Sequence, residues 1–127
     1  MLDGAHNPQA IATVTPEIES IAGTTRPPRA AVVFAAMHDK DAAAMLARLP
    51  EPWPLVLTRT DAPDATDPAT LLDRLPPDRR TDAVTAPDTA TALRRAAALV
   101  GHGALVVVLG SLRLVGEART ALGLPPA

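Results

Sequence analysis

The chain has 127 residues, the size of one ordinary domain, and 47% of them are apolar, so a buried core can form. Its net charge of −2 argues against a nucleic-acid-binding surface, and the absence of cysteine excludes disulfides and thiolate metal sites. The longest apolar run, residues 104–109, is too short to span a membrane, and the first residues show no secretion signal. We therefore expect a cytoplasmic protein.

In the first half of the chain, apolar runs of strand length alternate with helical patterns. Residues 1–2 are a strand stub, and Asn7 and Pro8 suit the N-cap and first position of a helix that we expect to reach about residue 22. A strand is predicted over 30–36. A turn at 37–41 follows it, then a helix to about residue 49, for which Asp39 is the first N-cap candidate and Asp41 also suits the first turn.

The second half continues the alternation. We expect strands at 55–58, 82–84 and 104–109, and helices at 68–75, from Asp88 to residue 100, and from the turn Gly110-Ser111 to about residue 123. The continuous apolar strands 30–36 and 104–109 indicate burial on both faces. The pattern predicts an α/β fold, a three-layer sandwich of Rossmann type with a mainly parallel sheet.

Ligands of such folds bind at the carboxyl ends of the strands, where three turns are expected: 3–8, 37–41 and 110–112. In the first, the carboxylate of Asp3 suits a ribose hydroxyl pair. His6, beside exposed helix N–H groups, suits a phosphate or acyl-phosphate oxygen. A plain strand-to-helix turn would explain Asp3 and the cap Asn7 without any ligand, but it would not explain His6.

The second turn holds Lys40, the only lysine among twelve basic residues. A cation near a helix N-terminus opposes the macrodipole, so its position favours a carboxylate ligand; the alternative is a solvated lysine between Asp39 and Asp41. In the third turn, Ser111 suits a carboxylate ligand, although helix capping alone is the simpler interpretation.

Other polar residues favour simpler explanations. His38 is interpreted as an exposed turn residue, His102 lies at the opposite edge of the predicted sheet, and Glu117 and Arg119 read as surface groups of the last helix. The three histidines have no metal-ligand spacing, and no Gly-x-x-x-x-Gly-Lys-Ser/Thr phosphate loop is present.

The same three turns carry a family resemblance. Residues 2–10, Leu-Asp-Gly-Ala-His-Asn-Pro-Gln-Ala, resemble the opening motif of the carboxy-terminal domain of folylpolyglutamate synthases and dihydrofolate synthases. Residues 33–41 resemble the second motif of that domain, with Ala35 where the family usually has glycine, and residues 108–119 resemble the last. The motifs stand in the family's order and cover nearly the whole chain. The family belongs to the Mur ligase superfamily.

The resemblance implies a domain of an ATP-dependent ligase that joins L-glutamate to folate through an acyl phosphate. It implies that Asp3, His6 and Asn7 face ATP, with Asp3 on the ribose and His6 as the catalytic contact, and that Lys40 and Ser111 face glutamate. Mg²⁺ is implied for the whole enzyme but not for binding by this domain.

On this interpretation residues 1–127 form one Mur ligase-type carboxy-terminal domain, with its first strand shortened and the central ATPase domain absent. Alone, such a domain is expected to be inactive. The rival interpretation is a stand-alone, non-catalytic binding or interaction module with the same fold. A Rossmann-type oxidoreductase is disfavoured, because no Gly-x-Gly-x-x-Gly opens a helix.

Overall fold

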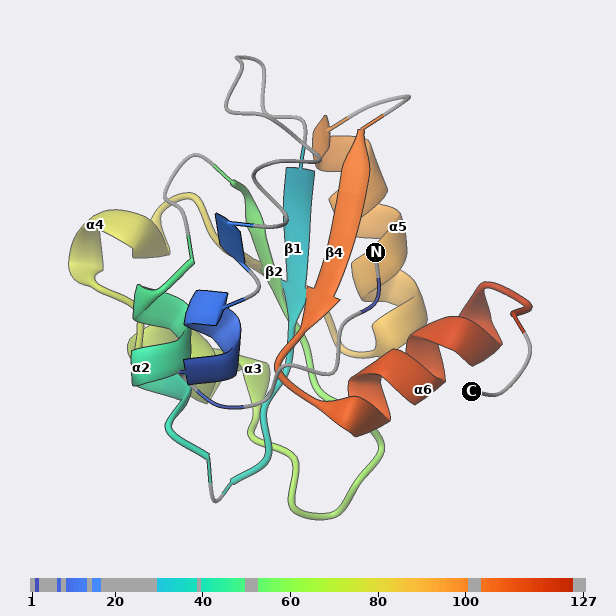
Figure 1. The fold of residues 1–127 in the computed structure, drawn as a ribbon, viewed down its shortest axis with the longest axis horizontal. Helices are drawn as coiled ribbons and strands as arrows, with labels where there is room; N and C mark the ends of the chain where they lie inside the picture. The colour runs from blue at the N-terminus through green and yellow to red at the C-terminus, as the bar shows by residue number, and fades with distance from the viewer. Residues whose placement is uncertain are drawn as a thin grey trace.

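A parallel sheet forms the centre of the molecule (Figure 1). The structure, a computed structural model, describes residues 2, 7, 9–13, 15–16, 30–38, 40–49, 53–100 and 104–124. Within these ranges the strands are β1 (Ala30–Phe34), β2 (Leu55–Leu57), β3 (Val84–Thr85) and β4 (Leu105–Leu109). Their order is β3-β2-β1-β4, and every neighbouring pair is parallel.

The start of the chain lies beside this sheet. Leu2 forms an isolated parallel bridge with Val108, on the edge of β4 that faces away from β1. Leu2, in the strand stub expected at residues 1–2, therefore lies beside β4 and is paired in parallel with it.

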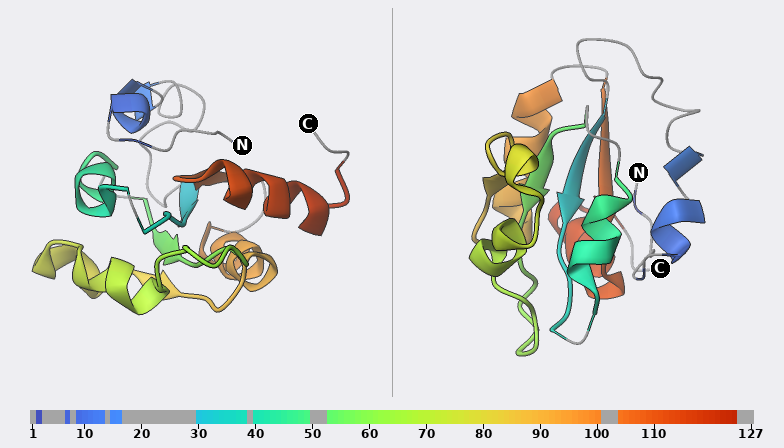
Figure 2. Two further views of the ribbon diagram at one scale, coloured as in Figure 1. Left: turned by 90° about the horizontal axis from the view of Figure 1, so that it is seen from below. Right: turned by 90° about the vertical axis from the view of Figure 1, so that its left-hand side faces the viewer.

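Helices cover both faces of the sheet, which gives three layers; Figure 2 shows the sheet nearly edge-on between α2 and α5. The labelled helices are α2 (Ala42–Ala47), α3 (Pro68–Asp73), α4 (Pro77–Arg80), α5 (Thr89–Val100) and α6 (Leu112–Ala121), and residues 9–13 and 15–16 are also helical. The expected α/β sandwich is confirmed.

The side chains of each strand alternate between the two faces of the sheet, and they form the two halves of the core. In β1, Val32 and Phe34 pack in one apolar cluster with Leu46 of α2 and Leu71 of α3. Its intervening residues pack in the other cluster, which contains Leu114 of α6. Successive side chains of a strand point to opposite faces, so one fully buried strand holds both layers of helices in place.

The elements match the expected ones with a few displacements. The strand expected at 82–84 is Val84–Thr85, and the helix expected over 68–75 ends at Asp73. Asp88 does cap α5, because its Oδ1 accepts a hydrogen bond from Thr91 N at 2.7 Å. The expected continuation of the first helix beyond residue 16, and the turn containing His102, lie outside the described residues.

Helix α4 was not predicted. Its four residues have no apolar periodicity, and two arginines hold it by side-chain hydrogen bonds to backbone carbonyls of the preceding helix ends. Arg79 Nη1 donates to Leu49 O at 3.1 Å, just beyond α2, and Arg80 Nε donates to Leu75 O at 3.0 Å, just beyond α3. These bonds satisfy carbonyls that a helix end leaves without partners.

Candidate functional site

The carboxyl ends of β1 and β4 meet at one edge of the sheet. Phe34 and Leu109, the last residues of the two strands, are direct partners in the parallel ladder. The turns that follow these strands therefore leave the sheet side by side, and they are two of the three turns in which ligand contacts were expected.

Gly110 makes this close approach possible. Its φ is +105°, a conformation that side chains rarely allow, and a Cβ built there would lie 2.2 Å from Ala35 O and 2.8 Å from the Phe34 ring. Because only glycine fits, the backbone after β4 passes directly against the backbone after β1. This contact fixes the position of the next residue, Ser111, relative to the end of β1.

Lys40 lies in the turn after β1 and is half-buried. Its backbone is held on both sides: Lys40 N donates to Met37 O at 3.1 Å, and Lys40 O accepts from Ala42 N at 3.0 Å. Within the described ranges its ammonium group forms no ion pair. The N-cap of α2 is Asp41, whose Oδ1 accepts from Ala44 N at 3.0 Å, so preferring Asp39 as the cap was wrong.

Ser111 is the N-cap of α6 and is almost fully buried. Its hydroxyl oxygen accepts a hydrogen bond from Leu114 N at 3.3 Å, so the capping interpretation holds. That bond is long and uses one acceptor position of the hydroxyl, which leaves the hydroxyl hydrogen available for a carboxylate. The two roles of Ser111 are compatible.

The first turn is described only in part. Asp3 and His6 lie outside the described residues. Asn7 caps the first helix, with Oδ1 accepting from Ala10 N at 2.8 Å, as expected. The bridge between Leu2 and Val108 brings the chain to the same edge of the sheet just before Asp3.

The loop after β2 runs along this edge and pairs with the turn after β1. Thr66 N donates to Ala36 O at 2.9 Å, His38 N donates to Asp64 O at 2.7 Å, and Met37 and Ala65 form an antiparallel bridge. His38 itself is exposed, as expected of a turn residue. The turn that carries Lys40 is thus held by a loop from the next strand.

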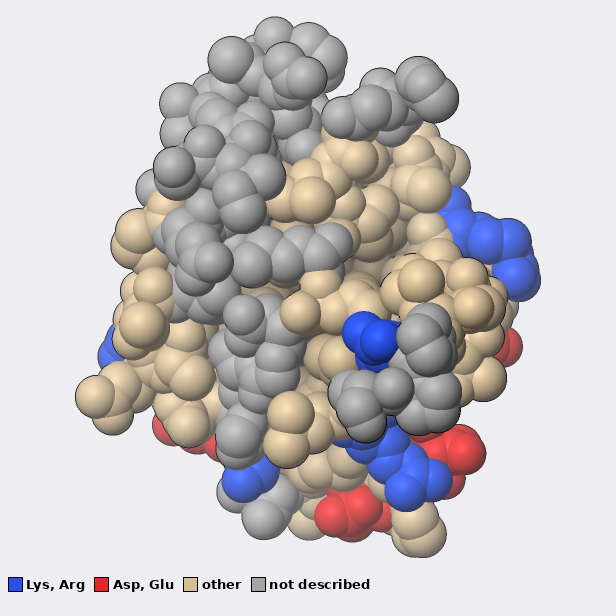
Figure 3. Space-filling model, turned by 45° about the vertical axis from the view of Figure 1, so that its right-hand side comes forward, with Lys and Arg blue, Asp and Glu red and all other residues tan. Residues whose placement is uncertain are grey.

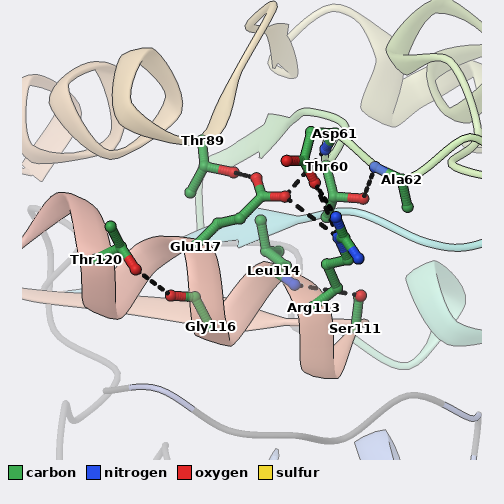
Figure 4. A network of polar contacts seen from close by, with 10 residues as sticks. All are labelled: Thr60, Asp61, Ala62, Thr89, Ser111, Arg113, Leu114, Gly116, Glu117 and Thr120. Carbon is green, nitrogen blue, oxygen red and sulfur yellow. Dashed lines mark hydrogen bonds and ion pairs between the residues drawn. The ribbon is translucent and has the colours of Figure 1, made fainter. Parts of the chain in front are cut away.

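A polar network joins the same loop to α6, and the sequence did not indicate it (Figure 4). Glu117 Oε2 accepts from Asp61 N at 2.9 Å, and Glu117 Oε1 accepts from Thr89 Oγ1 at 2.7 Å. Arg113 donates from Nε and Nη2 to Asp61 Oδ1 at 2.8 and 2.6 Å. Interpreting Glu117 as a simple surface group was wrong, because its partners lie 56 and 28 residues away in the chain and meet only in the fold.

The charges of this network are mutually stabilising. Hydrogen bonds from Arg113 lower the pKa of the Asp61 carboxyl, and the same contact raises the pKa of Arg113. Figure 3 shows acidic and basic side chains adjoining at the lower end of the molecule, the end toward which β1 and β4 point in Figure 1. In the part of the chain that the structure describes, no three His, Asp or Glu side chains are grouped to hold a metal ion, and no helix is long and apolar enough to cross a membrane.

Comparison with known proteins assigns the family. The family model described as "Mur ligase, glutamate ligase domain" matches residues 1–112. The chain belongs to this family. Two curated relatives, from Haloferax volcanii and Halobacterium salinarum, are each named a probable bifunctional folylpolyglutamate synthase/dihydropteroate synthase. They are 36% and 39% identical to this chain over 94% of its length, and the chain spans 14% of theirs.

Solved structures of folylpolyglutamate synthases share the fold. The Mycobacterium tuberculosis enzyme complexed with ADP and AMPPCP is 27% identical, with a TM-score of 0.80 over 98% of this chain and 30% of that one. A bifunctional folylpolyglutamate synthase/dihydrofolate synthase with Mn, AMPPNP and L-glutamate bound is 26% identical, with a TM-score of 0.78 over 97% of this chain and 29% of that one. The resemblance to folylpolyglutamate synthases in the motifs is confirmed.

Proposed function

We propose that this chain is the nucleotide- and glutamate-contacting domain of a cytoplasmic, ATP-dependent folylpolyglutamate synthase. Its membership of the glutamate ligase domain family supports this, as do relatives of known structure whose ligands are ATP analogues and L-glutamate. Because the chain spans about 30% of those structures, the remaining parts of the reaction belong to other domains of the ligase.

The observation that carries the proposal is the pairing of Phe34 with Leu109 at the ends of two parallel strands. It brings the turns of Lys40 and Ser111 to one edge, where an ammonium group and a hydroxyl can bind one carboxylate of glutamate. Leu2 pairs with Val108 near the same edge, and Asp3, His6 and Asn7 follow it in the sequence. There Asp3 takes the ribose of ATP, and His6 and Asn7 face its phosphates.

The reaction has two steps. A folate carboxylate oxygen attacks the terminal phosphorus of ATP, which gives an acyl phosphate and ADP. The amine of glutamate then attacks the acyl carbon, loses a proton, and displaces phosphate. Lys40 and Ser111 hold the glutamate so that its amine reaches the acyl carbon, and His6 stabilises charge on the phosphate oxygens. Mg²⁺, which neutralises phosphate charge, is assigned to the rest of the enzyme.

The test compares this chain alone with the ligase polypeptide that contains it. Phosphate release that depends on ATP, folate and glutamate should appear only in the longer polypeptide, because the site needs groups from two domains. If the isolated chain released phosphate in this assay, it would hold a complete active site, and its assignment as one part of the site would be wrong. A gene whose reading frame lacks a phosphate-loop domain upstream would instead support a stand-alone binding module.

A further inference from the structure

Glu117 connects three segments that are far apart in the sequence. It lies in α6, and its two carboxylate oxygens accept hydrogen bonds from Asp61, in the loop after β2, and from Thr89, the first residue of α5 (Figure 4). Both partners follow the carboxyl ends of strands. Glu117 therefore holds loops at the same edge of the sheet as the proposed glutamate site.

One of the contacts of Glu117 reaches a buried partner. Thr89 is 4% exposed, so its hydroxyl needs an acceptor inside the protein, and a charged acceptor shortens and strengthens the bond. Arg113, one turn earlier in α6, lies 3.7 Å from Glu117 Oε2 and binds the side chain of Asp61. The loop is thus attached to α6 through both the backbone and the side chain of Asp61.

The other end of this loop is attached to the turn of Lys40. Residues 64–66 pair with residues 36–38 through two hydrogen bonds, which form the antiparallel bridge between Met37 and Ala65. Ser111 is the N-cap of α6, the helix that carries Glu117. The loop after β2 therefore spans the distance between the two residues proposed to hold glutamate, and Glu117 is its anchor on the Ser111 side.

We propose that Glu117 is a positioning residue for the glutamate site: by anchoring the loop after β2 to α6, it holds the turn of Lys40 in place relative to Ser111. This inference rests on the proposed function. Glu117 acts through the loop and through α6, without touching a substrate, so its loss should weaken glutamate binding more than it slows the chemical step.

Glu117→Ala and Glu117→Gln in the ligase that contains this chain separate positioning from general stability. Alanine removes both hydrogen bonds. Glutamine keeps the first, since its carbonyl can accept from Asp61 N, and reverses the second, since its amide can donate to Thr89 Oγ1. We expect Glu117→Ala to raise the glutamate KM about tenfold with kcat changed less than about threefold, and Glu117→Gln to restore most of the loss.

The matched control is Thr120→Ala, on the same helix, since the hydroxyl of Thr120 donates to Gly116 O within α6. It should leave the glutamate KM unchanged. Hydrogen exchange gives a readout that needs no activity: the amides of residues 61, 62 and 64–66 should exchange faster in Glu117→Ala than in Thr120→Ala. Equal exchange in the two variants would overturn the anchoring role.

The kinetic outcomes distinguish this inference from the proposed function. If Lys40→Ala raises the glutamate KM but Glu117→Ala does not, the positioning role is wrong and the site assignment stands. If neither Lys40→Ala nor Ser111→Ala changes the glutamate KM, the site assignment itself is wrong. A rise of the KM in Glu117→Ala that Glu117→Gln does not reverse would assign the effect to the ion pair with Arg113 and would overturn anchoring by hydrogen bonds.

Discussion

At the scale of single residues, Lys40 is the sharpest test of the proposed site. A charge-assisted hydrogen bond is worth about 1.5–3 kcal/mol, so Lys40→Ala should raise the glutamate KM about ten- to a hundredfold. The ATP KM should change much less, because Asp3 and His6 are assigned to the nucleotide. Steady-state kinetics with each substrate varied in turn measures both constants.

The matched control for Lys40 is Arg48→Ala. Arg48 is exposed at the C-cap of α2, so the variant removes the same charge from the other end of the same helix. It should leave both KM values unchanged. An unaltered glutamate KM in Lys40→Ala, with equal or higher thermal stability, would show that Lys40 is a solvated side chain whose removal relieves the helix dipole.

Gly110 gives a residue-scale prediction for stability. In Gly110→Ala the new Cβ would overlap Ala35 O at 2.2 Å, and the residue would have to keep a φ of +105°. Strained backbone and overpacking each cost about 1–3 kcal/mol, so the free energy of unfolding should fall by roughly 2–6 kcal/mol. Urea denaturation measures this. Gly116→Ala is the control: a Cβ there meets nothing within 4 Å, and helix propensity predicts a gain of about 0.5–1 kcal/mol.

At the scale of elements, the cap of α5 has a predictable pH dependence. The hydrogen bond from Thr91 N lowers the pKa of Asp88 below 3.8, the ordinary value for aspartate. The stability that this carboxylate contributes is present above 3.8 and is lost as the pH falls through the lower folded pKa. Asp88→Asn keeps a good N-cap but cannot ionise, so the stability difference between wild type and variant should shrink on acidification.

Thermal unfolding of both proteins at about pH 7 and about pH 2 tests this linkage. The wild type should be the more stable at neutral pH, and the advantage should be mostly gone at the acidic pH. If the difference in stability between the two proteins stayed constant across this range, the negative charge of Asp88 would not stabilise α5 beyond the hydrogen bond of the N-cap.

Elements that a local sequence pattern specifies could be predicted from the sequence. Elements held by side-chain contacts that form only in the fold could not. Continuous apolar runs in the sequence predicted β1 and β4, and Asp88 as an N-cap predicted the start of α5. Helix α4 has no apolar periodicity that could predict it, and hydrogen bonds from its arginines to the ends of α2 and α3 hold it in place. Similarly, the motifs indicated Lys40 and Ser111, but Glu117 is a glutamate on a helix until folding brings Asp61 and Thr89 to it.

At the scale of the whole molecule, β1 joins the two halves of the core. Because its residues alternate between two apolar clusters on opposite faces of the sheet, damage to either cluster should weaken the whole domain. Leu71 of α3 and Leu114 of α6 are both fully buried, one in each cluster. Each change of leucine to alanine should lower the free energy of unfolding by about 2–5 kcal/mol.

The single tryptophan makes the coupling between the faces measurable. Trp53 is buried in the cluster of Leu71, across the sheet from Leu114. If the molecule unfolds as one unit, Leu114→Ala should move the fluorescence transition of Trp53 and the far-ultraviolet circular dichroism transition together, by as much as Leu71→Ala moves them. If Leu114→Ala shifted the dichroism transition but left Trp53 fluorescence in place, the two faces would unfold separately, and β1 would not couple them.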